Sequence, residues 1–382
     1  TRNTYASLAG NSGQGSLAHV LDTVRTEATG DLETALLRVD NMNLAEVRDA
    51  LTDLAPGIQA ATRRALVDQP HREAGEILKR LEDSAFQTST LQQDAASTSV
   101  GKDYPGYSVW GNVATSSGFQ DSRDVIPCLS AHTMNLFLGV DQQHGHWTTG
   151  LATAFLQHAL DSGDDESHAD ITSVRGYLHT IWRQRLRDAG PYVAASLGAG
   201  RSRVETFREL RFLGQEADAQ HWAHDMSLGV AMGHVFAPGA WRIQPFVQLT
   251  GLYLHENSVA EQNAGAMNLD IDASDGTSLR STLGLRAGRS ISLASATLFP
   301  EARLQWTHAM NSDAADHIRA RFESFGPAFE IDNDPTRDTL LLGVGLTLAA
   351  QNLSGGMMYE YRMNDHGNGE DHQLGIQLGY RF

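Results

Sequence analysis

The side chains that could carry out chemistry are scattered along this chain and do not form a recognisable catalytic motif. Its 382 residues contain no Gly-x-Ser-x-Gly nucleophile elbow, no His-Glu-x-x-His metal motif and no phosphate-binding loop. His144, His146 and the histidines within 366–372 could bind a metal ion, but they fall in expected turns or loops, where histidine is simply tolerated. The acidic stretch 161–170 lacks the spaced aspartates of a calcium loop. We therefore predict no catalytic, cofactor-binding or metal-binding residues.

A second kind of chemistry, ion pairing in a crowded polar space, is suggested by charges placed at alternating positions of apolar segments. These charges are Arg280, Arg286, Glu301, Arg303 and Glu360. Successive side chains of a strand point to opposite faces, so the charges lie on the face opposite the apolar residues. Arginine keeps its charge when partly desolvated and binds carboxylates in bidentate fashion. We expect the five residues to line a polar lumen, where they contact another segment or pair only with each other and with water.

The bulk composition limits what can position these residues. Hydrophobic residues make up 41% of the chain, which is enough for a folded protein. The longest apolar stretch, 340–350, is only 11 residues and is broken by Thr347, whereas a membrane-spanning helix needs about 20. A mean hydropathy of −0.32 still permits a membrane β-barrel, because each strand shows only every second side chain to lipid. The net charge of −17 argues against a nucleic-acid partner.

The N-terminal residues 1–85 are predicted to be helical. Apolar residues from Ser16 to Asp83 recur at three- and four-residue spacing, Asn43 is a predicted N-cap for a run over 44–54, and Pro56 and Gly57 precede the last run. That run, 58–83, would extend about 39 Å as a helix, which is long enough to thread a barrel lumen. Residues 86–104 show neither period and are predicted to be a linker.

From residue 105 to 382 the apolar residues alternate strictly with small or charged ones, as in Leu374–Phe382. Strands of ten or more residues with one apolar face are longer than those of a soluble sandwich, and they match an outer-membrane barrel. We predict twelve antiparallel strands near 107–118, 131–142, 146–160, 170–184, 191–207, 219–236, 241–254, 278–289, 296–309, 337–350, 356–364 and 372–382.

The connections and the tryptophans agree with this all-β transmembrane barrel. Links near 143–145, 187–190, 237–240 and 351–355 are short, whereas 255–277 and 310–336 are long, as expected for periplasmic turns and extracellular loops. An even strand count places both barrel ends on the periplasmic side. Five tryptophans near strand ends are expected in aromatic girdles: Trp110, Trp147, Trp182, Trp241 and Trp306.

Four stretches of the chain carry a family resemblance. They are Leu-Ala-x-x-Leu-Asp at 17–22, Ala-Leu-x-x-Leu-Ala-Pro at 50–56, Tyr-Ser-Val-Trp-Gly at 107–111 and the terminal Leu-Gly-Ile-Gln-Leu-Gly-Tyr-Arg-Phe at 374–382. On these residues the whole chain resembles the C-terminal translocator domain of autotransporters, the type V secretion proteins. The last stretch departs from the general pattern, which has glycine where this chain has Gln377.

The resemblance implies a translocator barrel in the bacterial outer membrane, with an α-helical segment partly threading the lumen. It implies an N-terminal passenger delivered to or anchored at the cell surface, outer-membrane lipid around a monomer, and recognition by the barrel-assembly machinery. The expected assembly signal is Leu374, Ile376, Leu378, Tyr380 and Phe382. No cofactor and no enzymatic activity are expected of this part.

Three alternatives remain at this stage. A diffusion porin would share the barrel, although porins commonly have more strands and do not need a helical preface. A soluble sandwich would share the alternation but not the terminal Phe382. Some autotransporters cut their passenger inside the barrel at an asparagine pair, and Asn41 and Asn43 resemble such a site loosely, although Asn43 is explained more simply as a helix cap.

Overall fold

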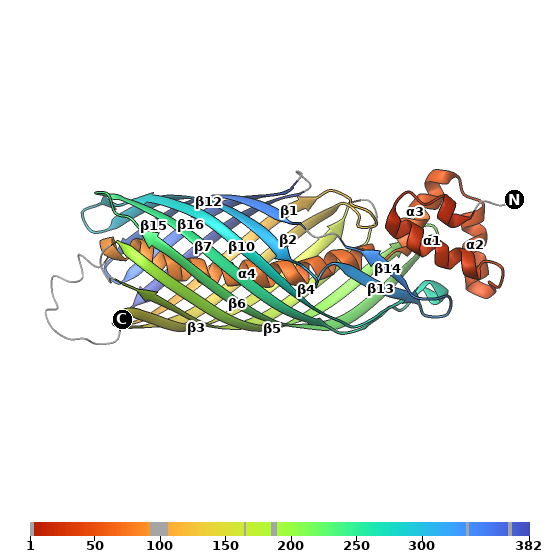
Figure 1. The fold of residues 1–382 in the computed structure, drawn as a ribbon, viewed down its shortest axis with the longest axis horizontal. Helices are drawn as coiled ribbons and strands as arrows, with labels where there is room; N and C mark the ends of the chain where they lie inside the picture. Colours follow the sequence, from red (N-terminus) through yellow and green to blue (C-terminus); the bar gives the residue numbers. More distant parts are fainter. Residues whose placement is uncertain (1–3, 92–105, 164–165, 185–188, 334–335, 366–368) are drawn as a thin grey trace.

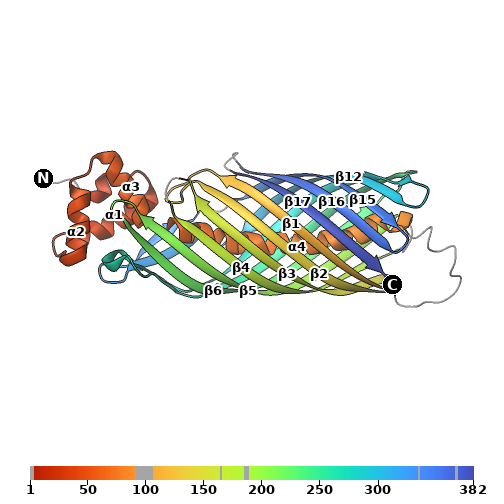
Figure 2. The ribbon, with the colours of Figure 1, turned by 180° about the vertical axis from the view of Figure 1, so that it is seen from behind.

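Twelve long strands form a closed antiparallel barrel in the computed structural model, which describes residues 4–91, 106–163, 166–184, 189–333, 336–365 and 369–382. Each strand pairs with its neighbours in sequence order, including β10 with β12, and the pairing of β1 with β17 closes the barrel. The strands are β1 (Gly106–Gln120), β2 (Leu129–His144), β3 (Trp147–Ser162), β4 (His168–Arg183), β5 (Gly190–Leu210), β6 (Gln215–Val235), β7 (Trp241–Glu256), β10 (Ser274–Arg289), β12 (Thr297–Asn311), β15 (Asp338–Ala350), β16 (Leu353–Asn364) and β17 (Gly369–Arg381). The predicted twelve-stranded barrel is confirmed (Figures 1 and 2).

The apolar residues that alternate along each strand face outward, and the small or charged residues between them face the lumen. In β17, Leu374, Ile376 and Leu378 are exposed on the outside. In the lumen the buried side chains include many charged ones, such as Arg175 and Arg286. This inversion of a soluble core is what a barrel in lipid requires.

Three short helices form a bundle at one end of the barrel (Figure 1). They are α1 (Ser12–Val24), α2 (Gly30–Asp40) and α3 (Leu44–Leu54), preceded by the 3₁₀ turn η1 (Tyr5–Ser7). The predicted cap at Asn43 is present: its side chain accepts from the backbone N–H groups of Ala45 and Glu46, and Glu46 in turn accepts from the Asn43 N–H.

The long helix α4 (Gly57–Leu91) runs through the lumen from the bundle to the end where Phe382 lies (Figures 1 and 2). It continues six residues into the stretch 86–104 that the sequence marks as a linker, and residues 92–104 of that stretch lie outside the described residues. Pro70 stands in the middle of α4, so the carbonyl of Leu66 has no intrahelical donor four residues on. In the described part of the chain, no helix is both long enough and apolar enough to cross a bilayer.

The two long connections predicted near 255–277 and 310–336 fold into a small second sheet beside the bundle. Its strands, in the order β14-β13-β9-β8, are β14 (Phe329–Asp332), β13 (His317–Phe322), β9 (Leu269–Ile271) and β8 (Val259–Ala260); a short turn η3 (Gly265–Met267) precedes β9. The other short strand, β11 (Ile291–Ser292), pairs with β12 at the opposite end of the barrel. The periodicity did not predict the small sheet, because its strands are too short to show alternation.

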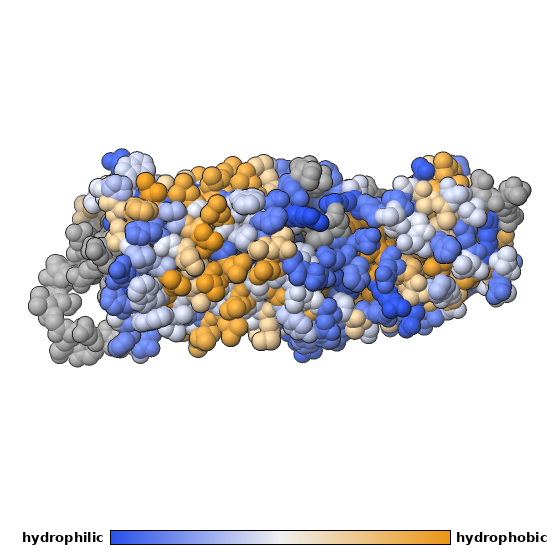
Figure 3. Space-filling view, viewed as in Figure 1, coloured by the Kyte–Doolittle hydropathy of each residue, from blue (hydrophilic) through white to orange (hydrophobic). Residues whose placement is uncertain are grey.

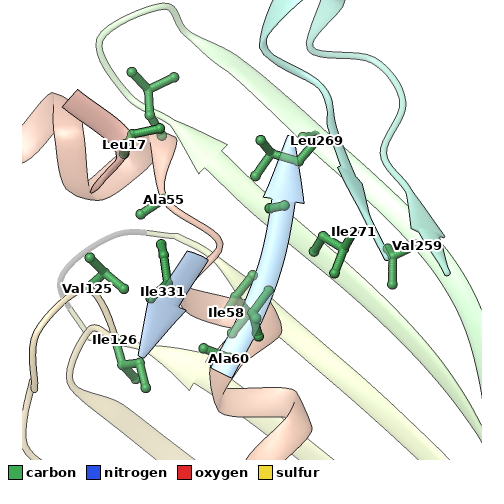
Figure 4. Packing of buried hydrophobic residues seen from close by; sticks show 14 of the residues in the cluster. Leu17, Ala55, Ile58, Ala60, Val125, Ile126, Val259, Leu269, Ile271 and Ile331 are labelled. Atoms are coloured by element: carbon green, nitrogen blue, oxygen red, sulfur yellow. The ribbon is translucent and has the colours of Figure 1, made fainter. Parts of the chain in front are cut away.

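A hydrophobic core joins the bundle, the small sheet and the start of α4. Figure 4 shows Leu17 of α1, Ile58 of α4 and Ile331 of β14 converging, with Leu269 and Val125 around them. The long strands β5 and β6, each 21 residues, extend up to this core, where Leu210 and Ala217 are buried. The end of the barrel that holds the bundle is therefore covered by a folded cap, formed by α1–α3 and β8, β9, β13 and β14.

Candidate functional site: the occupied barrel lumen

The middle of the lumen face of β5 and β6 consists of small side chains, and α4 lies against it. These small residues are Ala194, Ser196, Gly198, Ser227, Gly229 and Ala231. A Cβ atom at Gly229 would lie 3.0 Å from Leu78 Cδ1 of α4 and 2.6 Å from Ser196 Oγ, both too close for normal packing. Glycine is needed here because the helix approaches the strand closely.

An apolar cluster packs α4 against the barrel wall near the C-terminal end of the helix. Leu78, Leu81 and Phe86 are fully buried there among side chains of the barrel wall. The ring of Phe86 meets that of Phe299 edge to face, with centroids 5.3 Å apart at 88°. Burying each such side chain stabilises the packed state by about 1.5–3 kcal/mol.

On the β4 side, Glu73 of α4 lies in a buried charged cluster. Arg175 Nη1 donates to Glu73 Oε1 at 2.9 Å, and Tyr177 donates its hydroxyl to Glu73 Oε2 at 3.0 Å. The Nε atom of the same guanidinium donates to Asp225 at 3.0 Å. One arginine is thus shared by a carboxylate of the helix and one of the barrel, which offsets the cost of burying all three charges.

On the opposite wall, charges of α4 alternate with charges of β16 and β17. Lys79 Nζ lies 2.5 Å from Glu360 Oε1, and Arg362 bridges Glu360 at 2.8 Å to Asp371 at 3.0 Å. Arg72, nearly two helical turns before Lys79, pairs with the same Asp371 at 2.7 Å. The ladder connects two turns of the helix to two neighbouring strands.

A third cluster lies where α4 passes β10 and β12. Asp83 Oδ1 is 2.6 Å from Arg286 Nη1, and Arg286 Nη2 is 2.5 Å from Glu301. Glu82, the neighbour of Asp83, faces Arg303 at 3.5 Å. All five side chains are almost completely buried.

Asp141 on β2 holds a fourth contact with the helix. It accepts from Arg80 of α4 at 3.0 Å, from the indole N–H of Trp110 at 3.1 Å, and lies 2.7 Å from His179 Nε2. The Trp110 ring points into the lumen, beneath the guanidinium of Arg80 at 5.3 Å. The expectation that Trp110 belongs to an outer girdle is therefore wrong, whereas Trp147, Trp241 and Trp306 are exposed on the outside.

The structure places all five charges singled out from the sequence on the lumen side, and four of them contact α4. Arg280 pairs with Asp68, Arg286 with Asp83, Arg303 with Glu82 and Glu360 with Lys79. Glu301 reaches the helix through Arg286. Sequence reasoning missed Arg175, Asp225 and Asp141, although each occupies the polar parity of its strand and could have been found by that signal.

Polar cavities lie beside α4. One, of about 150 Å³, lies between the helix and β1, β16 and β17, with Lys79, Arg80 and Asp141 on its wall. Another, of about 130 Å³, lies towards β12 and β15, with Asp68, Arg280 and Glu360 on its wall. Each has room for several water molecules among groups that can bind them.

The residues of the expected assembly signal lie together on the outer surface of β17. Leu374, Ile376, Leu378, Tyr380 and Phe382 are between 43% and 72% exposed. Gly375, Gln377 and Gly379 alternate with them on the other face. β17 pairs along its whole length with β1, from Ser108 opposite Arg381 to Gln120 opposite Gly369.

The asparagines considered for self-cleavage lie outside the barrel. Asn41 ends α2, and the Asn43 side chain is engaged in capping α3. The lumen helix α4 contains no asparagine. Within the described ranges, no group of three or more histidine, cysteine or acidic side chains could hold a metal ion, and His366 lies outside those ranges.

The outer surface shows where lipid meets the protein. In Figure 3, apolar side chains gather on the half of the barrel nearer the C-terminus, and polar ones dominate towards the bundle. A closed barrel with an apolar exterior and a charged, occupied lumen defines an integral outer-membrane β-barrel protein.

Comparisons with known proteins specify the family. The family model described as the autotransporter beta-domain matches residues 109–360, more than half of the chain. The translocator domain of autotransporter NalP from Neisseria meningitidis has the same fold, with a TM-score of 0.64 at 15% identity over 86% of this chain and 100% of that one. The beta domain of the Bordetella autotransporter BrkA gives 0.51 at 19% identity over 72% of this chain and 98% of that one.

The chain belongs to the autotransporter beta-domain family. It is the translocator domain of an autotransporter, a barrel embedded in the bacterial outer membrane. Two curated proteins from Serratia marcescens, each called Extracellular serine protease, are 24% and 23% identical to it over 72% of this chain. The chain spans about a quarter of the length of these relatives, 26% in each case.

Proposed function

We propose that α4 stays in the lumen as a plug once the passenger has been delivered, and that the domain then serves as a closed membrane anchor. The observation that carries this proposal is the set of buried charges on α4. They face β4 through Glu73, β2 through Arg80, β16 through Lys79, and β10 through Asp83. Withdrawing the helix would leave the charges of the wall that face it without these partners, which is costly for buried groups.

The direction of α4 supports a passenger at the cell surface. The ends of the barrel, Gly106 and Arg381, lie at the end with the short turns, which is the periplasmic side of such barrels. The chain preceding α4 lies at the opposite end, in the cap (Figure 2). A polypeptide continuing upstream of the bundle would therefore start outside the cell.

The activity of the longer protein belongs to its passenger in this proposal. The Serratia relatives bear a protease name on much longer chains, and their match to this chain is confined to about a quarter of their length. We assign no catalytic role to this chain, and we place any enzymatic activity upstream of it.

We further propose that the domain is a monomer delivered by the barrel-assembly machinery. A closed barrel leaves no strand edge for pairing with a second copy. The exposed apolar residues of β17, ending at Phe382, provide the surface that the assembly machinery would recognise.

Ion conductance in planar bilayers tests the plug. The refolded intact chain is expected to be closed, and a chain beginning at Tyr104 is expected to conduct, because it lacks α4. Equal conductance of the two chains would contradict the proposal that α4 plugs the lumen and would favour a porin.

A variant of the full chain keeps this test independent of the truncation. Glu73→Gln, Lys79→Gln and Asp83→Asn each leave a buried partner charge of the wall uncompensated, at a cost of about 3–5 kcal/mol, so the intact barrel should open in frequent bursts. A control with Glu33→Gln, Asp49→Asn and Arg319→Gln makes the same charge changes on exposed side chains of the cap and should remain closed.

A further inference from the structure

Histidines recur on the outer surface of the barrel, on the side of the cap. On five strands the outward-facing series of apolar residues is followed, towards the cap, by a histidine. These histidines, called the histidine collar here, are His132, His224, His255, His308 and His372. Each lies two positions from an exposed residue of the lipid-facing series: Met134, Met226, Tyr253, Trp306 and Leu374.

The collar marks the extracellular edge of the lipid-facing band. The cap lies beyond it, and in the proposed function the cap end is the cell-surface end of the domain. The headgroups of the outer leaflet are therefore at the level of the collar.

The collar is densest on β5, β6 and β7, where Arg201 joins it. Arg201 pairs in register with His224, and His224 with His255. The two histidine rings stack with centroids 6.5 Å apart, and the Arg201 guanidinium lies 3.7 Å above the Trp222 ring. Neighbouring strands are about 4.8 Å apart, so the three side chains form a continuous row.

The charges around this row are unevenly compensated. His255 Nδ1 lies 2.8 Å from Asp275 on β10, whereas β4 places the uncharged Val174 opposite Arg201. Among the described residues, no carboxylate lies within ion-pair distance of Arg201, and the nearby Arg203 is paired with Glu205 at 2.5 Å. Protonation of the two histidines would therefore give the row a net positive charge.

Just inside the row, the lipid-facing surface is apolar. Ala199, Met226 and Tyr253 form the next register row, and Leu228 and Gly251 lie in the row after it. The exposed side chains of Met226, Tyr253 and Leu228 offer acyl chains an apolar surface directly beneath the cationic groups.

We propose that Arg201, His224 and His255 bind a phosphate of an outer-leaflet glycolipid with a phosphorylated sugar headgroup, more tightly when the histidines are protonated. Histidine as a class changes charge between pH 5 and 8. Each basic group beside an anionic headgroup contributes about 1 kcal/mol, or roughly a fivefold change in affinity. Binding to the row should therefore be tighter with both histidines protonated than with both neutral.

Native mass spectrometry of the full chain in detergent, with diphosphorylated lipid A as the probe, measures this binding. Affinity is expected to be at least about tenfold higher near pH 5.5 than near pH 8. Lipid A stripped of both phosphates is expected to show no such change. This comparison uses the unmodified chain, so it stands whether or not any variant folds.

Substitutions locate the site. His224→Gln with His255→Gln should abolish the pH dependence, and Arg201→Gln should weaken binding at both pH values. The matched control, His132→Gln with His372→Gln, changes two collar histidines on distant strands and should behave like the unmodified chain. Heat-modifiable gel mobility checks that each variant is folded.

Three results would overturn the proposal. The first is equal binding of the dephosphorylated lipid, and the second is equal binding of phosphatidylglycerol. The third is an equal loss of pH-dependent binding in the two double-histidine variants, which would show that the whole collar interacts with the membrane interface without a specific site.

Discussion

At Gly229 the barrel wall has no side chain, and Leu78 of α4 occupies the space. Around this contact the helix is held by charges that are buried on both sides, such as Glu73 and Arg175. Apolar fit gives the helix its position on the β5–β6 wall, and the charged pairs give it one rotation about its axis. A helix with only one of these two features could slide or turn in the lumen.

Gly229→Val tests this contact. A side chain there would meet Leu78 and Ser196, so α4 should be displaced and the closed barrel should begin to conduct in planar bilayers. Gly176→Val on the exposed outer face of β4 is the control: a Cβ atom there meets nothing within 4 Å, so the barrel should stay closed. Closed channels in both variants would show that the contact does not seal the lumen.

At the level of elements, the spacing of the apolar residues was a better guide to the fold than the type of any single residue. The twelve strands, the cap at Asn43 and the helical preface follow from the alternating and three- to four-residue spacings. Alternation along β1 also places Trp110 correctly in the lumen, because it shares a face with Ser108 and Asn112. The prediction of an outer girdle position followed instead from its being a tryptophan.

What the sequence did not predict depends on contacts between distant segments. The strands of the small sheet, such as β8 and β14, are two and four residues long and are defined by their neighbours. The partners of Glu73 lie 62 to 104 positions away, at Asn135, Arg175 and Tyr177. Parity says which residues face inward, but it does not say which turn of the helix each will meet.

The cap is joined to the barrel by Arg208 of β5. Its guanidinium donates to Glu261 at 2.9 Å and 2.5 Å, to the Asp53 carbonyl of α3 at 2.8 Å, and to the Met267 carbonyl at 2.9 Å. Arg208→Met should leave Glu261 buried without its cation, at a cost of about 3–5 kcal/mol. Limited proteolysis should then cut within 1–56 while the barrel resists; the exposed Arg321→Met is the control, and equal resistance of both would contradict this role.

For the whole molecule, the end of β17 allows the stability of the barrel to be tested separately from its assembly into the membrane. Phe382 is 72% exposed and touches Tyr380, with ring centroids 4.9 Å apart. Phe382→Ala should therefore change the stability of refolded protein by less than about 0.5 kcal/mol, yet lower its amount in the outer membrane of cells. Leu353→Ala, 58% exposed near the same end, should reduce neither; equal membrane levels for both variants would remove Phe382 from the assembly signal.

The proline in the middle of α4 has a mechanical consequence. If α4 is pulled along its axis, the turn around Leu66 should yield first, because the carbonyl of Leu66 lacks its helical partner. Stretching would then lengthen the outer half of α4, while Leu78, Leu81 and Phe86 on the inner half keep their places. Pro70 would then let the outer half of α4 extend under load before the contacts that hold the inner half in the lumen are broken.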